Sequence, residues 1–185
     1  MNIKEAITFI KEKLLKAGAN DPAFDTIYLF EYVLKLNRTQ LIINGDRELS
    51  DSDFSTLVSL ADRRIQGEPV QYIIGYWEFM GKKFYVGDGV LIPRDDTEVL
   101  VRACLDLLKG KDNLSIIDLC SGSGIIAVTL KKALLNSTVF AVEKSKIAFS
   151  YLTKNCKENE AEINALCSDL YECADDFSDN SFDLL

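Results

Sequence analysis

Hydrophobic spacing in the first part of the chain predicts consecutive helices. Isoleucine and leucine recur at three- and four-residue intervals from Ile3 to Leu14, and the run ends at Gly18, where glycine suits a left-handed helix end. Asp21 and Pro22 then have the order of an N-cap and a first helical residue. The pattern therefore predicts two helices in succession.

Two further helices are expected before the pattern changes. Thr39 is a candidate cap for a short helix through Leu41–Ile43. Ser50 with Asp53 resembles a capping box that opens a longer helix. Residues 1–75 are therefore predicted to form a small helical bundle without a chemical motif, suited to packing or docking.

At Tyr76 the helical spacing of apolar residues gives way to a cluster of aromatic residues. Aromatic residues flank Gly81 and Lys82, which predicts two short strands and a β-hairpin linker over residues 76–92. A helix follows, with Asp96 or Thr97 as its cap. Its buried face is expected to contain Leu100, Val101, Cys104, Leu105 and Leu108.

From Leu114 onward, short apolar strands alternate with helices, which is typical of a parallel, doubly wound sheet in an α/β fold. Such a sheet needs about 5 to 7 strands, so residues 93–185 are expected to be the N-terminal part of a truncated domain. Strands are expected at 115–119, 138–143 and 163–167, with the first residues of a fourth at 181–185.

Composition narrows the function classes. The net charge of −8, from 21 Lys and Arg against 29 Asp and Glu, argues against a protein that coats nucleic acid. The chain has no His, which excludes Ser-His-Asp and Cys-His catalysis and His-ligated metals. Five Cys without a C-x-x-C pair suggest reduced thiols, no metal cluster and a cytoplasmic location away from membranes.

A glycine-rich loop is expected between a strand and a helix, where small residues let a ligand approach the backbone. Gly122, Gly124 and Ala127 satisfy the spacing of the dinucleotide fingerprint. Glu143 ends the next expected strand, where an acid can accept hydrogen bonds from ribose hydroxyls. The order of these features predicts a site for an adenosine cofactor.

Asp118 bears on which cofactor this is. A carboxylate just ahead of the glycines can attract an ammonium group and repels a pyrophosphate, which favours S-adenosyl-L-methionine over a nicotinamide dinucleotide. The alternative is that Asp118 caps its own loop. Asp169 could accept from an adenine amino group with Leu170 packing on the ring, but Ser168 and Asp169 also resemble an ordinary helix-capping pair.

The segment from Pro93 to Glu98 carries three carboxylates in four residues at a helix start. This is more negative charge than a cap needs, although interaction with the helix dipole could account for it. Arg94 would offset part of the repulsion. Arg94, Thr97 and Glu98 are therefore further candidates for the cofactor site.

Four motifs taken together resemble the HemK/PrmC family of peptide-chain release factor glutamine N5-methyltransferases. They are Gly67-Glu68-Pro69-Val70-Gln71-Tyr72-Ile73-Ile74-Gly75, Trp77-Glu78-Phe79, Val90-Leu91-Ile92-Pro93-Arg94-x-x-Thr97-Glu98 and Asp118-Leu119-x-Ser121-Gly122-Ser123-Gly124. The resemblance covers nearly the whole chain. It implies a helical domain that helps to recognise the release factor, a hairpin linker and a class I, Rossmann-like methyltransferase domain.

The resemblance also implies roles for individual residues. Cys120, Ser121, Gly122, Ser123 and Gly124 would wrap the methionine and ribose of S-adenosyl-L-methionine. Glu143 would bind the ribose hydroxyls, and Asp169 and Leu170 would lie at the adenine. The substrate would be the glutamine of the Gly-Gly-Gln motif in a release factor.

Three departures from the family pattern stand out. Cys120 replaces a frequent glycine, and Asp95-Asp96 replaces Pro-Glu. The family's Asn-Pro-Pro-Tyr motif, which holds the glutamine amide, is expected just after Leu185 and is not in this chain. Residues 1–185 are therefore expected to contain no catalytic residue and to be inactive alone. The full-length protein is expected to be a monomer, whereas an open sheet edge would favour self-association of residues 1–185.

Three other interpretations remain open. A nicotinamide-dependent oxidoreductase would rest on the glycine pattern and Glu143. A nucleic-acid N6-adenine methyltransferase would share the cofactor loop, but the acidic charge and the helical domain disfavour it. A non-catalytic module would bind a release factor through the helical domain without regard to the cofactor.

Overall fold

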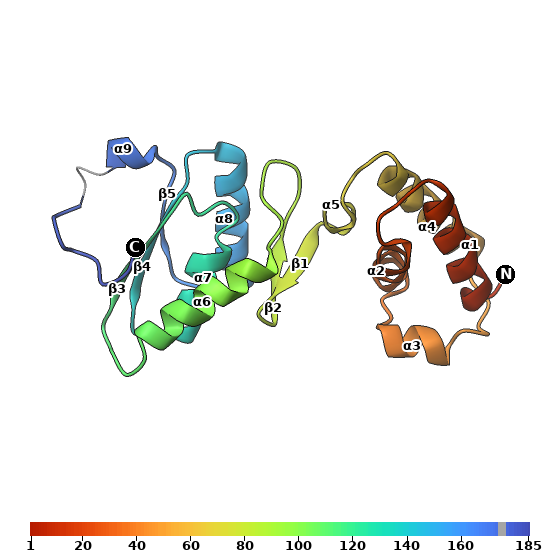
Figure 1. Cartoon of the computed structure of the whole chain (residues 1–185), viewed down its shortest axis with the longest axis horizontal. Helices are drawn as coiled ribbons and strands as arrows, with labels where there is room; N and C mark the ends of the chain where they lie inside the picture. The colour runs from red at the N-terminus through yellow and green to blue at the C-terminus, as the bar shows by residue number, and fades with distance from the viewer. Residues whose placement is uncertain (174–176) are drawn as a thin grey trace. The chain divides into compact units, whose positions relative to one another are not determined.

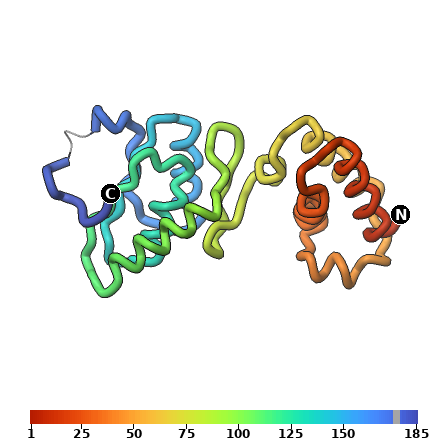
Figure 2. Tube along the Cα trace, viewed as in Figure 1, coloured from red at the N-terminus to blue at the C-terminus, as the bar shows by residue number. Residues whose placement is uncertain are grey.

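The computed structural model describes residues 1–173 and 177–185. The chain forms two compact units, residues 1–74 and 75–185 (Figures 1 and 2). The first unit is helical, and the second contains both of the chain's described sheets.

Of the four helices predicted in the first unit, all but one begin where the sequence predicts. Helix α1 buries a single face made of Ile3, Ala6, Ile10 and Leu14. The Asp21 side chain accepts the Phe24 N–H at the start of α2, as expected of an N-cap. The bounds are α1 Ile3–Lys16, α2 Pro22–Leu34, α3 Arg38–Ile43, α4 Asp51–Ile65 and α5 Val70–Ile74.

The exception is α3, whose cap is Asn37 and not Thr39. Asn37 Oδ1 accepts the Gln40 N–H at 2.9 Å, and Gln40 Oε1 accepts the Asn37 N–H at 2.9 Å. This reciprocal pair satisfies two backbone donors at once, which Thr39 cannot do from inside the first turn. Helix α5 was not predicted, because five residues are too few to show helical periodicity.

A buried ion pair joins α2 and α4. Arg64 Nε donates to Asp25 Oδ2 at 2.7 Å, and Asp25 is only 4% exposed. Burial raises the pKa of Asp25, and the neighbouring Arg64 opposes that shift. The pair lets a carboxylate occupy the interior of the unit between two helices.

The predicted hairpin is confirmed and belongs to the core of the second unit. Strands β1 (Tyr76–Phe79) and β2 (Lys82–Tyr85) pair antiparallel around Met80 and Gly81, which both have positive φ. Phe79 and Phe84 are buried in one hydrophobic cluster with residues of α6, α7 and the larger sheet. The hairpin is therefore packed against its own unit and is more than a connection.

The larger sheet is parallel, as predicted, with the strand order β3-β4-β5. The Asp183 N–H donates to the Ser115 carbonyl and the Ile117 N–H to the Leu184 carbonyl, so residues 183–184 add beside β3. This agrees with the predicted start of a fourth strand. The remaining bounds are α6 Asp95–Leu107, β3 Ser115–Leu119, α7 Ile125–Ala133, β4 Thr138–Val142, α8 Lys146–Glu158, β5 Asn164–Leu166 and α9 Leu170–Cys173.

Two expectations for α6 are wrong. The helix begins at Asp95 with Arg94 as its N-cap, so Asp96 and Thr97 lie within the first turn. Leu100 is 52% exposed, whereas Val101 is fully buried. Neighbouring helical residues point about 100° apart, which turns Leu100 away from the buried stripe.

Candidate cofactor-binding site

The carboxyl ends of three parallel strands meet at one edge of the larger sheet. Leu119 of β3 pairs with Val142 of β4, which in turn pairs with Leu166 of β5. The segments that follow these strands contain the glycine loop, Glu143 and Asp169. Ligands of open α/β sheets bind outside the carboxyl ends of the strands, so the structure brings these candidate residues to a suitable edge.

The glycine loop is a tight turn pinned by its own backbone. The Ser121 N–H donates to the Val142 carbonyl at 3.0 Å, and the Gly124 N–H donates to the Ser121 carbonyl at 2.8 Å. Ser121 Oγ donates to the Asp118 carbonyl at 2.6 Å. Cys120 and Gly122 both have φ of 58°, so the loop holds a left-handed conformation at two places.

The two glycines of the loop serve different purposes. A side chain added at Gly122 would meet nothing within 4 Å, whereas a Cβ at Gly124 would lie 3.0 Å from Leu152 Cγ of α8. Gly124 therefore allows α8 to pack closely. Gly122 leaves the front of the loop open, which is the arrangement needed where a ligand approaches the backbone.

Asp118 is turned toward the first turn of α7. Its Oδ2 accepts the Ala127 N–H at 3.2 Å. Burial raises the pKa of this carboxyl to about 6, and the nearby charge of Glu143 adds to the shift. The contact agrees with the alternative in which Asp118 caps its own loop, and a hydrogen bond with the Ser121 side chain opposes part of the rise in pKa.

Glu143 joins the glycine loop to the segment after β4. Its Oε2 accepts the Gly122 N–H at 2.8 Å, and its Oε1 accepts the Ser145 N–H at 2.7 Å. Each carboxylate oxygen can accept a second hydrogen bond. Glu143 is therefore held in place by backbone donors while it keeps the capacity to accept from a pair of hydroxyl groups.

Asp169 caps the short helix α9. Its Oδ1 accepts the Tyr171 N–H at 3.0 Å, and its Oδ2 pairs with Lys144 Nζ at 2.5 Å. The hydrogen bond from Lys144 holds the pKa of Asp169 below its usual value. Leu170 lines a cavity of about 360 Å³ on one face of the sheet, together with Ile117 and Leu119.

The Arg94–Glu98 segment contacts the hairpin. Glu98 Oε1 accepts the Met80 N–H at 3.2 Å, and its Oε2 pairs with Arg102 at 3.1 Å. The Arg94 carbonyl accepts the Thr97 N–H and closes the first turn of α6. These contacts account for Glu98 as a residue that ties α6 to the hairpin turn.

Asn155 of α8 is a residue of this region that sequence analysis missed. It is fully buried, and its side-chain amide donates to the Ser123 carbonyl of the glycine loop at 2.8 Å. The signal was present in the sequence, because Asn155 continues the buried stripe of Ala148 and Leu152. A polar residue on an apolar face needs hydrogen-bond partners, and this one finds them.

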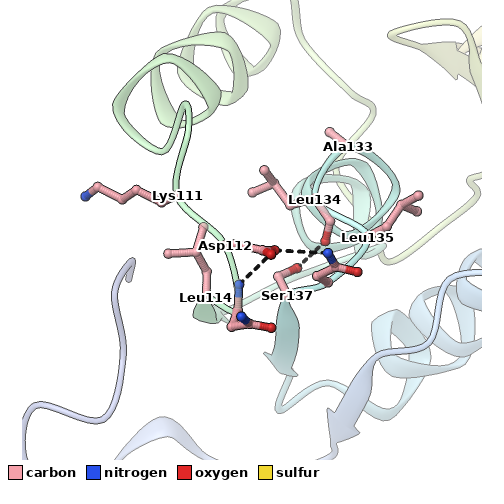
Figure 3. Close-up of a pocket in the computed structure, with 9 residues that line it drawn as sticks. Lys111, Asp112, Leu114, Ala133, Leu134, Leu135 and Ser137 are labelled. Carbon is pink, nitrogen blue, oxygen red and sulfur yellow. Dashed lines mark hydrogen bonds between the residues drawn. The ribbon is translucent and has the colours of Figure 1, made fainter.

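A second cavity lies at the opposite edge of the sheet (Figure 3). It measures about 260 Å³ and is bounded by residues 111–114 and 133–137, which precede β3 and β4. Asp112 Oδ1 accepts hydrogen bonds at 3.0 Å from the Asn113 N–H and from Asn136 Nδ2. The cavity therefore lies at the amino ends of the strands, away from the glycine loop.

The described residues offer neither a metal site nor a membrane span. Residues 1–173 and 177–185 contain no group of His, Cys, Asp or Glu placed to hold a metal ion. Over the same ranges, every helix is too short or too polar to cross a membrane.

Comparison with known proteins shows which family the chain resembles. Residues 5–75 match the model of the PrmC N-terminal domain, and residues 95–185 match the methyltransferase small domain. The release factor glutamine methyltransferase of Fusobacterium nucleatum is 36% identical over 176 residues, and that of Geobacter sulfurreducens is 33% identical over 183 residues. Over nearly its whole length, this chain is similar to proteins of the HemK/PrmC family.

The matches to HemK/PrmC proteins cover this chain more fully than they cover the relatives. The two alignments span 94% and 99% of this chain, but 49% and 63% of the relatives' own lengths. Among solved structures, the tRNA (uracil-54, C5)-methyltransferase of Pyrococcus abyssi matches 59% of this chain and 26% of its own, at 18% identity and a TM-score of 0.47.

Proposed function

We propose that the protein uses S-adenosyl-L-methionine to methylate the side-chain amide nitrogen of glutamine in the Gly-Gly-Gln motif of peptide-chain release factors. Similarity to the HemK/PrmC family supports the reaction class, because family models match both the helical unit and the methyltransferase unit. The relatives are release factor glutamine methyltransferases by name, which supports the choice of substrate. A release factor is therefore the expected partner, and the cytoplasm the expected location.

The choice of cofactor rests on one observation, which is that backbone N–H groups of the glycine loop are already hydrogen-bonded within the protein. The N–H groups of Ser121, Gly122 and Gly124 already donate within the protein. A pyrophosphate needs such donors to be free. Asp118 lies near the end of β3, and Glu143 and Asp169 follow β4 and β5. The carboxylates of Asp118 and Glu143, which have no ion pair among the described residues, make this edge suitable for a ligand with ammonium and sulfonium charges.

The candidate residues at the carboxyl ends of the strands then have roles in holding the cofactor. Residues 120–124 would wrap its methionine and ribose, since Gly122 leaves the loop open. Glu143 would accept from the ribose hydroxyls, and Asp118 would face the ammonium group. Asp169 and Leu170 would lie at the adenine. When bound, S-adenosyl-L-methionine supplies an electrophilic methyl group on sulfur.

Asp118 would couple cofactor binding to pH. Burial raises its pKa to about 6 in the chain alone. A cationic ammonium group nearby favours the charged carboxylate and lowers that pKa. Binding of the cofactor would therefore release a proton from Asp118, and affinity would rise as the pH increases through about 6.

Methyl transfer also requires that the glutamine be positioned. An amide nitrogen is a poor nucleophile, so catalysis depends on orientation and on dipoles that stabilise developing charge. The resemblance assigns this task to Asn-Pro-Pro-Tyr, a motif that residues 1–185 do not contain. We therefore expect residues 1–185 to bind the cofactor without methylating a release factor.

Calorimetric titration of residues 1–185 with S-adenosylhomocysteine and, separately, with NADH tests the cofactor. We expect S-adenosylhomocysteine to bind and NADH not to bind. Glu143→Gln should weaken binding about tenfold, by loss of a charged acceptor. The matched control is Asp112→Asn, at the opposite edge of the sheet, which should leave affinity unchanged. Binding of NADH alone would contradict the proposal.

Transfer of labelled methyl groups to a release factor by the whole protein tests the reaction. Label should appear on the Gly-Gly-Gln glutamine and be lost when that residue is replaced. Release-factor binding without methylation, at saturating cofactor, would instead favour a non-catalytic module. Labelling of DNA or RNA adenine would favour a nucleic-acid methyltransferase.

A further inference from the structure

The chain segment from Lys83 to Gly89 lies along α8 in a regular register. Figure 1 shows β2 beside α8, and four pairs of contacts join the segment to that helix. When the residue number increases by two along the segment, the number of its partner on the helix decreases by four. The pairs are Lys83 with Asn159, Tyr85 with Asn155, Gly87 with Tyr151 and Gly89 with Ile147.

The two periods match because of the geometry of the elements. Four helical residues rise about 6 Å, and two residues of an extended strand rise about 6.6 Å. Residues two apart on a strand also face the same side. Strand β2 can therefore follow one stripe of α8 from Lys83 to Tyr85, whereas Gly87 and Gly89 lie beyond the strand, in a turn where the Val90 N–H donates to the Gly87 carbonyl.

The first two pairs are hydrogen bonds from asparagine side chains to the open edge of β2. Asn155 Oδ1 accepts the Tyr85 N–H at 2.6 Å, and Asn155 Nδ2 donates to the Tyr85 carbonyl at 3.1 Å. Asn159 Nδ2 donates to the Lys83 carbonyl at 2.9 Å. The Asn155 amide thus pairs with Tyr85 as the backbone of a neighbouring strand would.

The last two pairs depend on the absence of a side chain. A methyl group at Gly87 would overlap the Tyr151 hydroxyl, and a methyl group at Gly89 would lie 2.7 Å from Ile147 Cγ2. Helix α8 therefore occupies the space that side chains at these two positions would need. The contacts carry the segment toward the start of α8, where Ser145 caps the helix.

One of the α8 residues that contact the 83–89 segment also contacts the glycine loop. Asn155 Nδ2 donates to the Ser123 carbonyl at 2.8 Å, and the residue is 0% exposed. We propose that Asn155 is a positioning residue that fixes the 83–89 segment to the glycine loop, so that the two keep one relative position when cofactor binds. This inference rests on the proposed cofactor site.

Asn159 provides a matched control on the same helix. Each asparagine binds the edge of β2 through its own side-chain amide. The other described hydrogen bond of the Asn159 side chain goes to the Asn155 carbonyl, within the same helix. Asn159→Ala should therefore loosen the hairpin and spare the loop. Asn155→Ala removes both connections, and Asn155→Ser keeps a small polar group at the buried site.

The experiment measures the affinity of each variant for S-adenosylhomocysteine and the amide hydrogen exchange of Gly122 and Gly124. In Asn155→Ala we expect the dissociation constant to rise about tenfold and loop exchange to quicken by a similar factor. Asn155→Ser should show a smaller change of the same sign. Asn159→Ala should change both quantities less than twofold.

Equal effects of Asn155→Ala and Asn159→Ala, or an unchanged loop in the Asn155 variants, would overturn the proposal. If the unaltered chain fails to bind S-adenosylhomocysteine, the proposed function fails, while loop exchange still decides the role of Asn155. The unaltered chain offers a further test, because coupling is reciprocal. Saturating S-adenosylhomocysteine should slow exchange of the Tyr85 amide several-fold, and no change there would refute the coupling even if no variant folds.

Discussion

The two units of this chain are specified at different ranges along the sequence. In the helical unit, α1 to α4 each begin at a residue whose side chain accepts an N–H three positions later, as Asn2, Asp21, Asn37 and Ser50 do. In the second unit, α6 and α7 have no cap hydrogen bond from their own N-cap side chains. Helix α7 instead receives Asp118, which lies nine positions before Ala127. Helices α8 and α9 do have local caps, Ser145 and Asp169. The two units therefore differ at α6 and α7, the helices on either side of β3, which lack a cap from their own N-cap residues.

The carboxylates of the two units, buried at Asp25 and partly buried at Asp118 and Glu143, show the same difference. Asp25 of the helical unit is paired with the Arg64 guanidinium, and this ion pair neutralises its charge and joins two helices. The described hydrogen bonds of Asp118 and Glu143 all come from backbone N–H groups or serve to fix the loop. Carboxylates held in this way keep a net negative charge, which is what a site for a cationic ligand requires.

The largest expected effect tests whether the buried pair belongs to the first unit alone. Arg64→Ala leaves Asp25 buried without its partner and should lower the free energy of unfolding of the helical unit by about 3–5 kcal/mol. Urea unfolding followed by circular dichroism should shift to lower urea. Fluorescence of Trp77, the single tryptophan, reports on the second unit and should keep its midpoint.

The control for Arg64 is Lys13→Ala, which breaks the more exposed pair of Lys13 and Asp62. Exposed ion pairs contribute about 0–1 kcal/mol, so this variant should unfold almost as the unaltered chain does. A loss in Lys13→Ala as large as that in Arg64→Ala would contradict the distinction between the two pairs.

A smaller effect is expected at the glycine loop of the second unit. Gly124→Ala should lower the free energy of unfolding by about 1–3 kcal/mol, since a residue with a side chain is strained at φ of 80° and the new Cβ approaches Leu152. Gly110 has φ of 79° with nothing within 4 Å of an added Cβ. The difference between Gly124→Ala and Gly110→Ala, read from Trp77 fluorescence, isolates the Leu152 contact. Equal losses would show that backbone strain alone decides both.

The raised pKa of Asp118 predicts a pH dependence of similar or smaller size. The folded chain binds the proton more tightly than the unfolded chain does, with a pKa of about 6 against 3.8 for an aspartate in water. Its contribution to stability is therefore complete below about pH 4 and is lost as the pH rises to about 6, by roughly 2–3 kcal/mol. Urea unfolding from pH 4 to 7, followed by the fluorescence of Trp77 in the second unit, should show this slope in the unaltered chain and a much smaller one in Asp118→Asn.

Asp118→Asn also separates stability from function. The variant should be at least as stable as the unaltered chain at pH 7, because it removes a costly buried charge, yet it should bind S-adenosylhomocysteine more weakly. Asp112→Asn is the control and should keep the slope. An unchanged affinity in Asp118→Asn would leave the capping contact with Ala127 as the whole role of this side chain.

The smallest effect tests the corrected cap of α3. Asn37→Ala removes the capping box with Gln40 and should lower the stability of the helical unit by about 1 kcal/mol. Thr39→Ala should change it by only a few tenths of a kcal/mol, since Thr39 lies inside the first turn. Thermal unfolding of the two variants compares them directly, and the opposite ranking would restore Thr39 as the cap.

Much of the secondary structure was predictable from short-range patterns. The cap at Asp21, the strand Ser115–Leu119 and the alternation of strands and helices were each visible within a few residues. Helix α5 was missed because it is one turn long. Leu100 was assigned to the wrong face because a run of apolar residues does not show where the buried stripe ends.

The features of the candidate site likewise divide into those set by short-range patterns and those set by long-range contacts. Hydrophobic periodicity, capping residues and the glycine spacing act between neighbours in the chain, so the linear order of residues was sufficient to place the loop, Glu143 and Asp169 at the ends of strands. Contacts across 21, 32 and 70 positions, such as Glu143 with Gly122 and Asn155 with Ser123 and Tyr85, exist only once the sheet and α8 have packed. The raised pKa of Asp118 belongs with them, because it depends on how much water the folded neighbours exclude.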